Sequence, residues 1–328
     1  MFQYILQRFF LMIPTLVIIS IVSFVVIQLP PGDFLTTYVA RVAEQDGMVD
    51  DALVAALRHR YGLDQPQHMR YLKWIGNILR GEWGHSLEWN RPVKELIFGR
   101  IGLTFVISLS TLLMGWVIAF PIGIYSAVKQ YSIGDYTFTA LSFIGVGIPD
   151  FLLALVFMYV VFKLFNYNAA GLFSTQYQEA PWSLGKLIDL LKHLWVPLLI
   201  LGIGGTAGLI RTMRANLLDE LGKPYVTTAR AKGLSERRVI FKYPVRVALN
   251  PFVSTVGWAL PGLISGTTIV SIVLGLPTTG PLLLRALQAQ DMYLAASFLL
   301  LLSTLTVLGT FISDVLLGWL DPRIRLGR

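Results

Sequence analysis

The chain has 328 residues, of which 55% are hydrophobic and only 14% are charged. Soluble domains carry about 25% charged residues, so this composition excludes an ordinary soluble enzyme, a disordered chain and a fibrous repeat. The net charge of +8 is typical of nucleic-acid binding, but the basic residues lie between apolar runs and leave no soluble basic domain. We therefore expect no nucleic-acid partner. The chain has no cysteine, which excludes disulfides and thiolate metal sites.

Long uncharged runs predict an all-α, polytopic membrane protein inserted in a lipid bilayer, because about 20 apolar residues cross the hydrocarbon core. The six expected transmembrane helices are residues 9–30, 101–128, 136–163, 194–214, 247–274 and 290–318. They leave two long connections, an extracytoplasmic loop over 31–100 and a cytoplasmic loop over 215–246. Two short amphipathic helices are expected in the outer loop, over 50–60 and 66–80. The chain as a whole forms a single transmembrane domain.

The distribution of basic residues predicts the orientation. Residues 211–246 contain nine Lys or Arg against three acids, and the tail 321–328 contains three against one. The outer loop is balanced, with nine of each sign over 30–100. Both termini are thus expected in the cytoplasm, with the protein in the inner (cytoplasmic) membrane.

Sequence signatures of enzymes are missing from the chain: it has no HExxH, no GxSxG and no phosphate-binding GxxxxGK[ST]. Four scattered histidines lack ligand spacing. We expect no catalytic residue, no metal site and no cofactor. The glycine-rich run that contains Gly204 and Gly208 lies inside an apolar span, so it predicts close helix packing rather than nucleotide binding.

Ionisable residues inside membrane spans are costly and indicate function or specific pairing. Asp150 follows Asp135 by 15 residues, about 22 Å along a helix, and therefore lies well inside the bilayer. It either lines a water-filled translocation path or is a buried structural polar group. Asp314, near the inner end of the last span, is expected to pair with Arg211 or Arg214.

The cytoplasmic loop carries strong local signals. Pro224 suits the first turn of a helix, Gly233 suits the residue after a helix end, and Ser235 can cap a second helix. The sequence thus predicts a short exposed helix, a sharp bend and a second helix. The small residues Ala229 and Ala231 would let the first helix enter a groove on another protein, whereas composition alone favours a solvated basic loop.

This loop resembles the cytoplasmic coupling motif of ABC-importer permeases that serve dipeptides, oligopeptides and nickel. The motif of that family is close to Tyr-Val-x-Thr-Ala-Arg-Ala-Lys-Gly-Leu, and the chain matches it from Tyr225 to Leu234. The residues that the resemblance assigns to ATPase coupling are Tyr225, Val226, Thr228, Ala229, Arg230, Ala231, Lys232, Gly233 and Leu234. Segments 4–8, 29–33, 61–64, 84–86 and 320–325 also resemble the first of the two permease subunits.

The resemblance implies the fold of a type I ABC importer permease, half of a transmembrane pathway. Its implied partners are a second homologous permease subunit, two ABC ATPase subunits that bind the ATP, and an extracytoplasmic solute-binding protein. Residues 247–284 lack the acid usual in peptide permeases. That departure resembles a branch associated with oligosaccharides or glycosides, so an oligosaccharide is the alternative substrate. An intramembrane enzyme would need paired carboxylates or a nucleophile with a base. An ATPase-independent channel or secondary transporter would leave the coupling motif unexplained.

Overall fold

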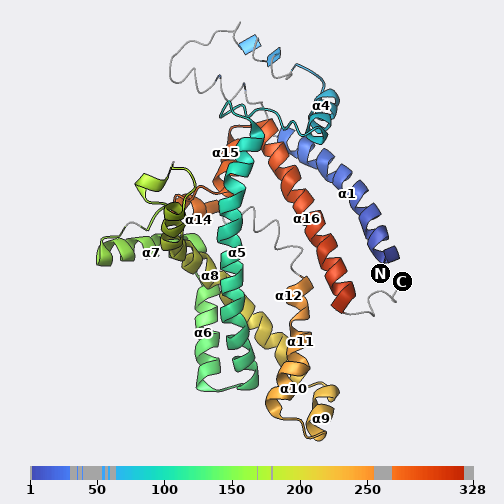
Figure 1. Ribbon diagram of the computed structural model, residues 1–328, viewed down its shortest axis with the longest axis vertical. Coiled ribbons are helices and arrows are strands. Elements are labelled where there is room, and N and C mark those ends of the chain that lie inside the picture. The colour runs from blue at the N-terminus through green and yellow to red at the C-terminus, as the bar shows by residue number, and fades with distance from the viewer. Residues whose placement is uncertain are drawn as a thin grey trace.

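The computed structural model describes residues 2–29, 64–167, 169–178, 180–254 and 268–320, with a few isolated residues of 30–63. Long helices dominate the described ranges (Figure 1). They are α1 (Phe2–Gln28), α4 (Gln67–Leu79), α5 (Val93–Val128), α6 (Ile133–Gly147), α7 (Asp150–Phe165), α8 (Leu184–Leu221) and α16 (Met292–Leu320). The shorter ones are η1 (Thr175–Tyr177), α9 (Pro224–Ala231), α10 (Glu236–Lys242), α11 (Pro244–Ala248), α12 (Asn250–Ser254), α14 (Thr268–Val273) and α15 (Thr279–Gln288).

Four described helices, α1, α5, α8 and α16, are long and apolar enough to cross a membrane. The predicted span 136–163 differs from the structure, which divides it into α6 and α7, bent by 99° at their junction. Pro149 explains the break, because a proline pushes the preceding residue out of helical geometry, and Ile148 is extended with φ −94 and ψ 123. The predicted span 247–274 includes 255–267, outside the described residues. A count of six spans therefore stays a prediction.

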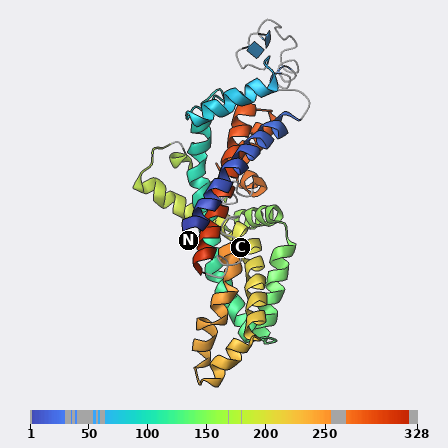
Figure 2. The same ribbon diagram turned by 90° about the vertical axis from the view of Figure 1, so that its right-hand side faces the viewer.

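Two helix pairs organise the molecule. α5 packs along α8, with α6 against α8, and α1 packs along α16. α5 and α8 approach closely at Gly123, where an added Cβ would lie 2.7 Å from Cβ of Met213. The predicted amphipathic helix 66–80 is confirmed as α4, which lies across one end of the α1–α16 pair (Figure 2). The other, 50–60, falls largely outside the described residues, as do 30–33, 61–63 and 321–328.

Both α5 and α8 are longer than the sequence predicted. α5 begins at Val93, after Pro92, although the prediction began at residue 101. α8 begins at Leu184, where the Ser183 side chain accepts a hydrogen bond from the Lys186 backbone N–H at 3.2 Å. Its last turns include the start of the predicted loop 215–246. These extensions bring charged residues, among them Arg100 and Lys186, onto the two helices.

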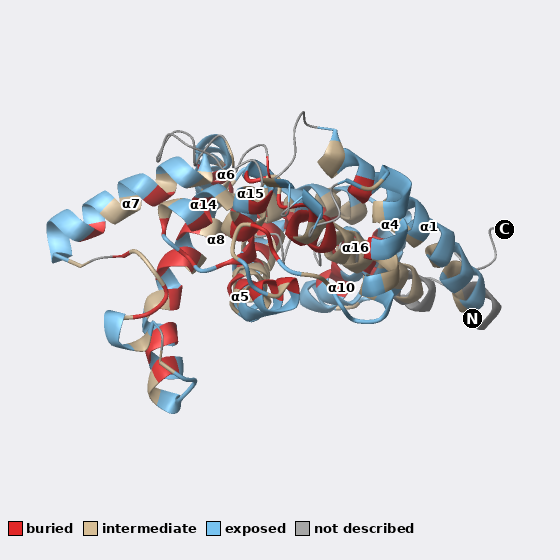
Figure 3. Cartoon of the chain, turned by 90° about the horizontal axis from the view of Figure 1, so that it is seen from above, coloured by how far each residue is buried: buried red, intermediate tan, exposed pale blue. Residues whose placement is uncertain are grey.

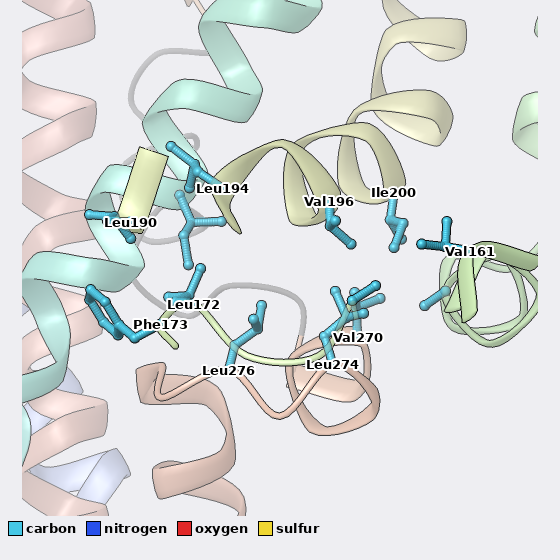
Figure 4. Close-up of a cluster of buried hydrophobic side chains, with 13 residues drawn as sticks. Val161, Leu172, Phe173, Leu190, Leu194, Val196, Ile200, Val270, Leu274 and Leu276 are labelled. Atoms are coloured by element: carbon cyan, nitrogen blue, oxygen red, sulfur yellow. The ribbon is translucent and has the colours of Figure 1, made fainter. Parts of the chain in front are cut away.

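A hydrophobic core joins α5, α7, α8 and α14 (Figure 4). Side chains of α7, α8, α14 and the segments around 172 and 275 meet in it. Its fully buried members include Ala154, Leu172, Ile200 and Leu274. Most of α7 beyond this contact is exposed (Figure 3), as expected for an apolar helix surrounded by lipid or protein.

Two ion pairs join described helices. Asp135 at the start of α6 accepts hydrogen bonds from Nε and Nη2 of Arg214 on α8, at 2.7 and 2.8 Å. Asp314 on α16 pairs with Arg8 of α1 at 3.3 Å. The expected pairing of Asp314 with Arg211 or Arg214 is therefore wrong. The reason is that α16 packs on α1, whereas Arg214 packs toward α6.

Candidate functional site

Residues 223–243, here called the coupling segment after the motif that they resemble, have the local structure that their sequence predicts. α9 begins with Pro224 in its first turn, and Gly233 follows its end with φ +75. Ser235 occupies the position before α10, but its side chain makes no capping hydrogen bond. The short helix, the sharp bend and the second helix are thus confirmed. In Figure 1, α9 and α10 project from the assembly at the end of α8.

Packing within the chain fixes the angle between α9 and α10. Val226 and Ala229 on α9 are buried against Val239 on α10. Across the bend, Nη2 of Arg230 donates to Oε1 of Glu236 at 2.6 Å, and its Nε lies 3.1–3.2 Å from both carboxylate oxygens. This ion pair lowers the pKa of Glu236. Ala229 therefore faces the chain's own core, not a partner, which corrects the expectation drawn from its size.

The opposite face of α9 is open. Tyr225, Thr228, Ala231 and Lys232 are exposed, and a depression of about 520 Å³ is lined by Thr227, Thr228 and Ala231 together with Gly222 and Pro224. The Tyr225 hydroxyl donates to Oε2 of Glu220, the penultimate residue of α8, at 2.5 Å. Burial and this hydrogen bond raise the pKa of Tyr225, so its hydroxyl remains a donor. The face thus combines small, apolar and basic groups, held at a fixed position relative to α8.

Asp150, the predicted path residue, is the first residue of α7 at the α6–α7 bend. It is partly buried, and its carboxylate lies against α8, where a Cβ added to Gly204 would be 2.7 Å from Oδ1. Within the described ranges no cation pairs with it. The close approach predicted for Gly204 is confirmed, while a Cβ on Gly208 would meet nothing within 4 Å. An unpaired carboxylate between two spans keeps both interpretations of Asp150 open.

A cavity of about 1000 Å³ between α5 and α8 was not predicted from the sequence. Arg100 and Lys186 line it. The sequence prediction puts residue 100 at the end of the loop 31–100, because the predicted second span begins after the last charged residue, Arg100 itself. The signal that marks it as helical is Pro92, a helix-start residue two turns earlier.

Two family models match most of the chain. Residues 119–326 match the family described as binding-protein-dependent transport system inner membrane component, and residues 1–108 match its N-terminal component. The chain is 34% identical over 325 residues to the oligopeptide transport system permease protein AppB of Bacillus subtilis, covering 99% of both chains. It is 30% identical over 341 residues to the dipeptide transport system permease protein DppB of Escherichia coli, again covering 99% of both. The oligopeptide permease protein OppB of Mycobacterium bovis is 30% identical over 279 residues, 84% of this chain and 86% of that protein.

The chain belongs to the family of binding-protein-dependent transport system inner membrane components. It is a multi-pass inner-membrane permease subunit of an ABC importer, and ATP is hydrolysed by separate ATPase subunits of such systems. A binding protein and an ATPase are accordingly its general partners. The oligosaccharide alternative receives no support, because the relatives named here are permeases for oligopeptides or dipeptides.

Proposed function

We propose that this chain forms half of the transmembrane pathway of an ATP-driven peptide importer. Its similarity to peptide permeases over 99% of its length is the observation that carries the proposal. A second homologous permease subunit forms the other half, two ATPase subunits bind the ATP, and a binding protein delivers the peptide from outside. This chain itself holds no cofactor.

We assign both termini and α9 to the cytoplasm. The basic bias of residues 211–246 supports this assignment. So does the arrangement in Figure 1, where the first residues of α1 and the last residues of α16 lie at the same end of that pair, away from α4. The long segment before α5 then lies outside, where a binding protein docks.

ATP hydrolysis reaches the pathway through Tyr225 to Leu234. The exposed face of α9 contacts an ATPase subunit, while Val226 and Ala229 hold the helix on α10. Asp150 lines the path at the α6–α7 bend, where its partly buried carboxylate has no described cation partner. An acid at this place favours passage of solutes that carry a positive amino group.

Purification of the tagged complex and its reconstitution in proteoliposomes test this function. We expect an ATPase and a second permease to co-purify, and ATP-dependent, binding-protein-dependent accumulation of peptides but not of oligosaccharides. Accumulation of oligosaccharides alone, or transport without an ATPase, would contradict the proposal.

The contact face is tested by Ala231→Trp, which fills the depression on α9. Lys242→Trp is the control, since Lys242 is an exposed residue of α10 outside that depression. We expect Ala231→Trp to abolish stimulated ATP hydrolysis while Lys242→Trp preserves it. Equal behaviour of the two variants would remove this face of α9 from the contact.

A further inference from the structure

The cavity between α5 and α8 carries an excess of positive charge. Arg91, Arg100 and Lys186 line it, and Glu95 is the acid among its lining residues. Glu95 already pairs with Arg91 at 3.3 Å, and both side chains are mostly exposed. Two cations therefore remain in the cavity without a carboxylate partner among the described residues.

Arg100 has most of its hydrogen-bonding capacity unused. Its Nη1 donates to the Leu96 backbone oxygen at 3.3 Å, one turn earlier on α5, and no other acceptor is found for it in the described part of the chain. The residue is partly buried, and the positive charges of Arg91 and Arg285 repel it. A partly desolvated guanidinium without an anion is costly, so this arrangement favours binding of an anion from solution.

Lys186 is buried, with 7% of its surface exposed, and no acid among the described residues pairs with it. Its Nζ donates to the Ala180 backbone oxygen at 2.5 Å and lies over the rings of Phe173 and Trp182, at 4.9 and 5.4 Å from their centroids. These contacts fix the ammonium in position and leave its net charge uncompensated. Lys186 thus adds a permanent positive potential to the cavity wall.

The cavity is large enough for a small peptide, and part of its wall belongs to a hydrophobic core. Leu172, Leu190 and Leu194 of the hydrophobic core in Figure 4 also line it, and Gly275 and Pro277 close it from the α14–α15 turn. A volume of about 1000 Å³ is at the upper end of the range for small-molecule sites. Apolar walls with a few fixed cations suit a solute that has both apolar side chains and a carboxylate, such as a peptide.

We propose that this cavity is an anion-selective vestibule of the pathway, in which Arg100 binds the C-terminal carboxylate of the peptide in transit. The inference rests on the proposed peptide function for the identity of the ligand. The planar guanidinium matches a carboxylate with two parallel hydrogen bonds, and Lys186 attracts the anion without contacting it directly. The carboxylate end of the bound peptide thus lies beside Arg100 of α5.

The charge of the cavity is measured first, on a reconstituted importer whose other subunits are freed of reactive thiols. Gly99 lines the cavity, and a Cβ there meets nothing within 4 Å, so Gly99→Cys introduces a probe into a cysteine-free chain. Anionic sulfonatoethyl and cationic trimethylammonioethyl methanethiosulfonates are compared. Each rate is divided by the rate of the same reagent with a free small thiol, because the two reagents differ in intrinsic reactivity, and we expect the larger normalised rate for the anionic reagent. Arg100→Gln should lower the anionic-to-cationic rate ratio about tenfold, and Lys94→Gln, an exposed cation of α5 outside the cavity, should not. A wild-type ratio without anion preference would overturn the proposal.

Uptake then tests the ligand. Random tripeptides are supplied as free acids and as C-terminal amides, and the lumenal contents are quantified by mass spectrometry. Arg100→Gln should reduce uptake of the acids about tenfold, the effect of losing a hydrogen bond to a charged group, and leave the amides unchanged. Arg100→Lys should restore much of the acid uptake. Equal loss of acids and amides would overturn the proposal, and dependence of that loss on anionic lipid would assign the site to a lipid headgroup. Failure of the wild type to import either form would instead contradict the peptide function, while the reagent ratio would still report the charge of the cavity.

Discussion

The bend after α9 depends on one backbone conformation, and replacing Gly233 tests whether coupling requires it. Gly233 has φ +75, and an added Cβ would meet no atom within 4 Å. The cost of a side chain is therefore the backbone cost alone, about 1–2 kcal/mol for alanine in the left-handed region, and it is higher for a β-branched residue. The bend sets the position of α9 relative to α10, so a change of the bend that relieves this strain displaces α9 and weakens its contacts with α10.

Gly222 provides a matched control at the other end of α9. Its φ is −80, and an added Cβ would come no closer than 3.9 Å to a neighbouring atom. Alanine there is unstrained and gains about 0.4–1 kcal/mol by restricting the unfolded chain. The two alanine variants should thus differ by about 2 kcal/mol, although they make the same chemical change at the two ends of one short helix.

The assay is peptide-stimulated ATP hydrolysis and uptake by the reconstituted importer, with folded yield measured alongside. We expect Gly233→Ala to lower both activities several-fold and Gly233→Val to lower them further. Gly222→Ala should lower them less than Gly233→Ala, because it adds only one unstrained methyl group to the depression beside α9. Gly233→Asn should retain most activity, because asparagine enters the left-handed region more readily than other side chains. Full coupling in Gly233→Val, or equal loss in Gly222→Ala, would refute the reasoning.

Three further predictions concern the spans. Asp135→Ala leaves the partly buried guanidinium of Arg214 unpaired and should destabilise the purified protein by about 3 kcal/mol. This is the low end for a broken buried pair, because 25% of the arginine side chain is exposed. An unchanged melting temperature would contradict this. Asp150→Asn should preserve assembly and change uptake if the carboxylate lines the path, whereas a lower folded yield with normal activity per molecule would assign it a structural role. Single cysteines at Arg80 and Ser235 should react with impermeant reagents from opposite sides of the membrane, and labelling from one side would overturn the orientation.

Local signals in the sequence predicted the coupling segment well. Proline at a helix start and glycine after a helix end act through the backbone of one or two residues, so they are readable without tertiary structure. Pro149 carried the same kind of signal, but a hydropathy window passes over it, and the span 136–163 was predicted as one helix. The 99° bend between α6 and α7 is the consequence.

Tertiary pairing was not readable in the same way. The sequence offered Arg211 and Arg214 as partners of Asp314. Because α16 packs on α1, Asp314 pairs with Arg8 instead. The cavity was not predicted because a span predicted from an uncharged run begins after the last charged residue. The sequence therefore assigns Arg100 to a loop, whereas the structure has it in α5. Its burial and its lack of a described acid partner depend on the approach of α8, from a part of the chain far away in sequence.

One helix connects every part of the candidate machinery. α8 has 38 residues, about 57 Å at 1.5 Å per residue. Along it, Lys186 lines the cavity, Gly204 contacts Asp150, Arg214 holds α6, and Glu220 holds Tyr225 at the start of α9. In the proposed importer, a force that an ATPase applies to α9 therefore acts on one end of a helix whose other end lines the cavity between α5 and α8. Since α5 and α6 both pack on α8, movement of α8 relative to them changes the cavity and the surroundings of Asp150 together, which is the coupling that an importer requires.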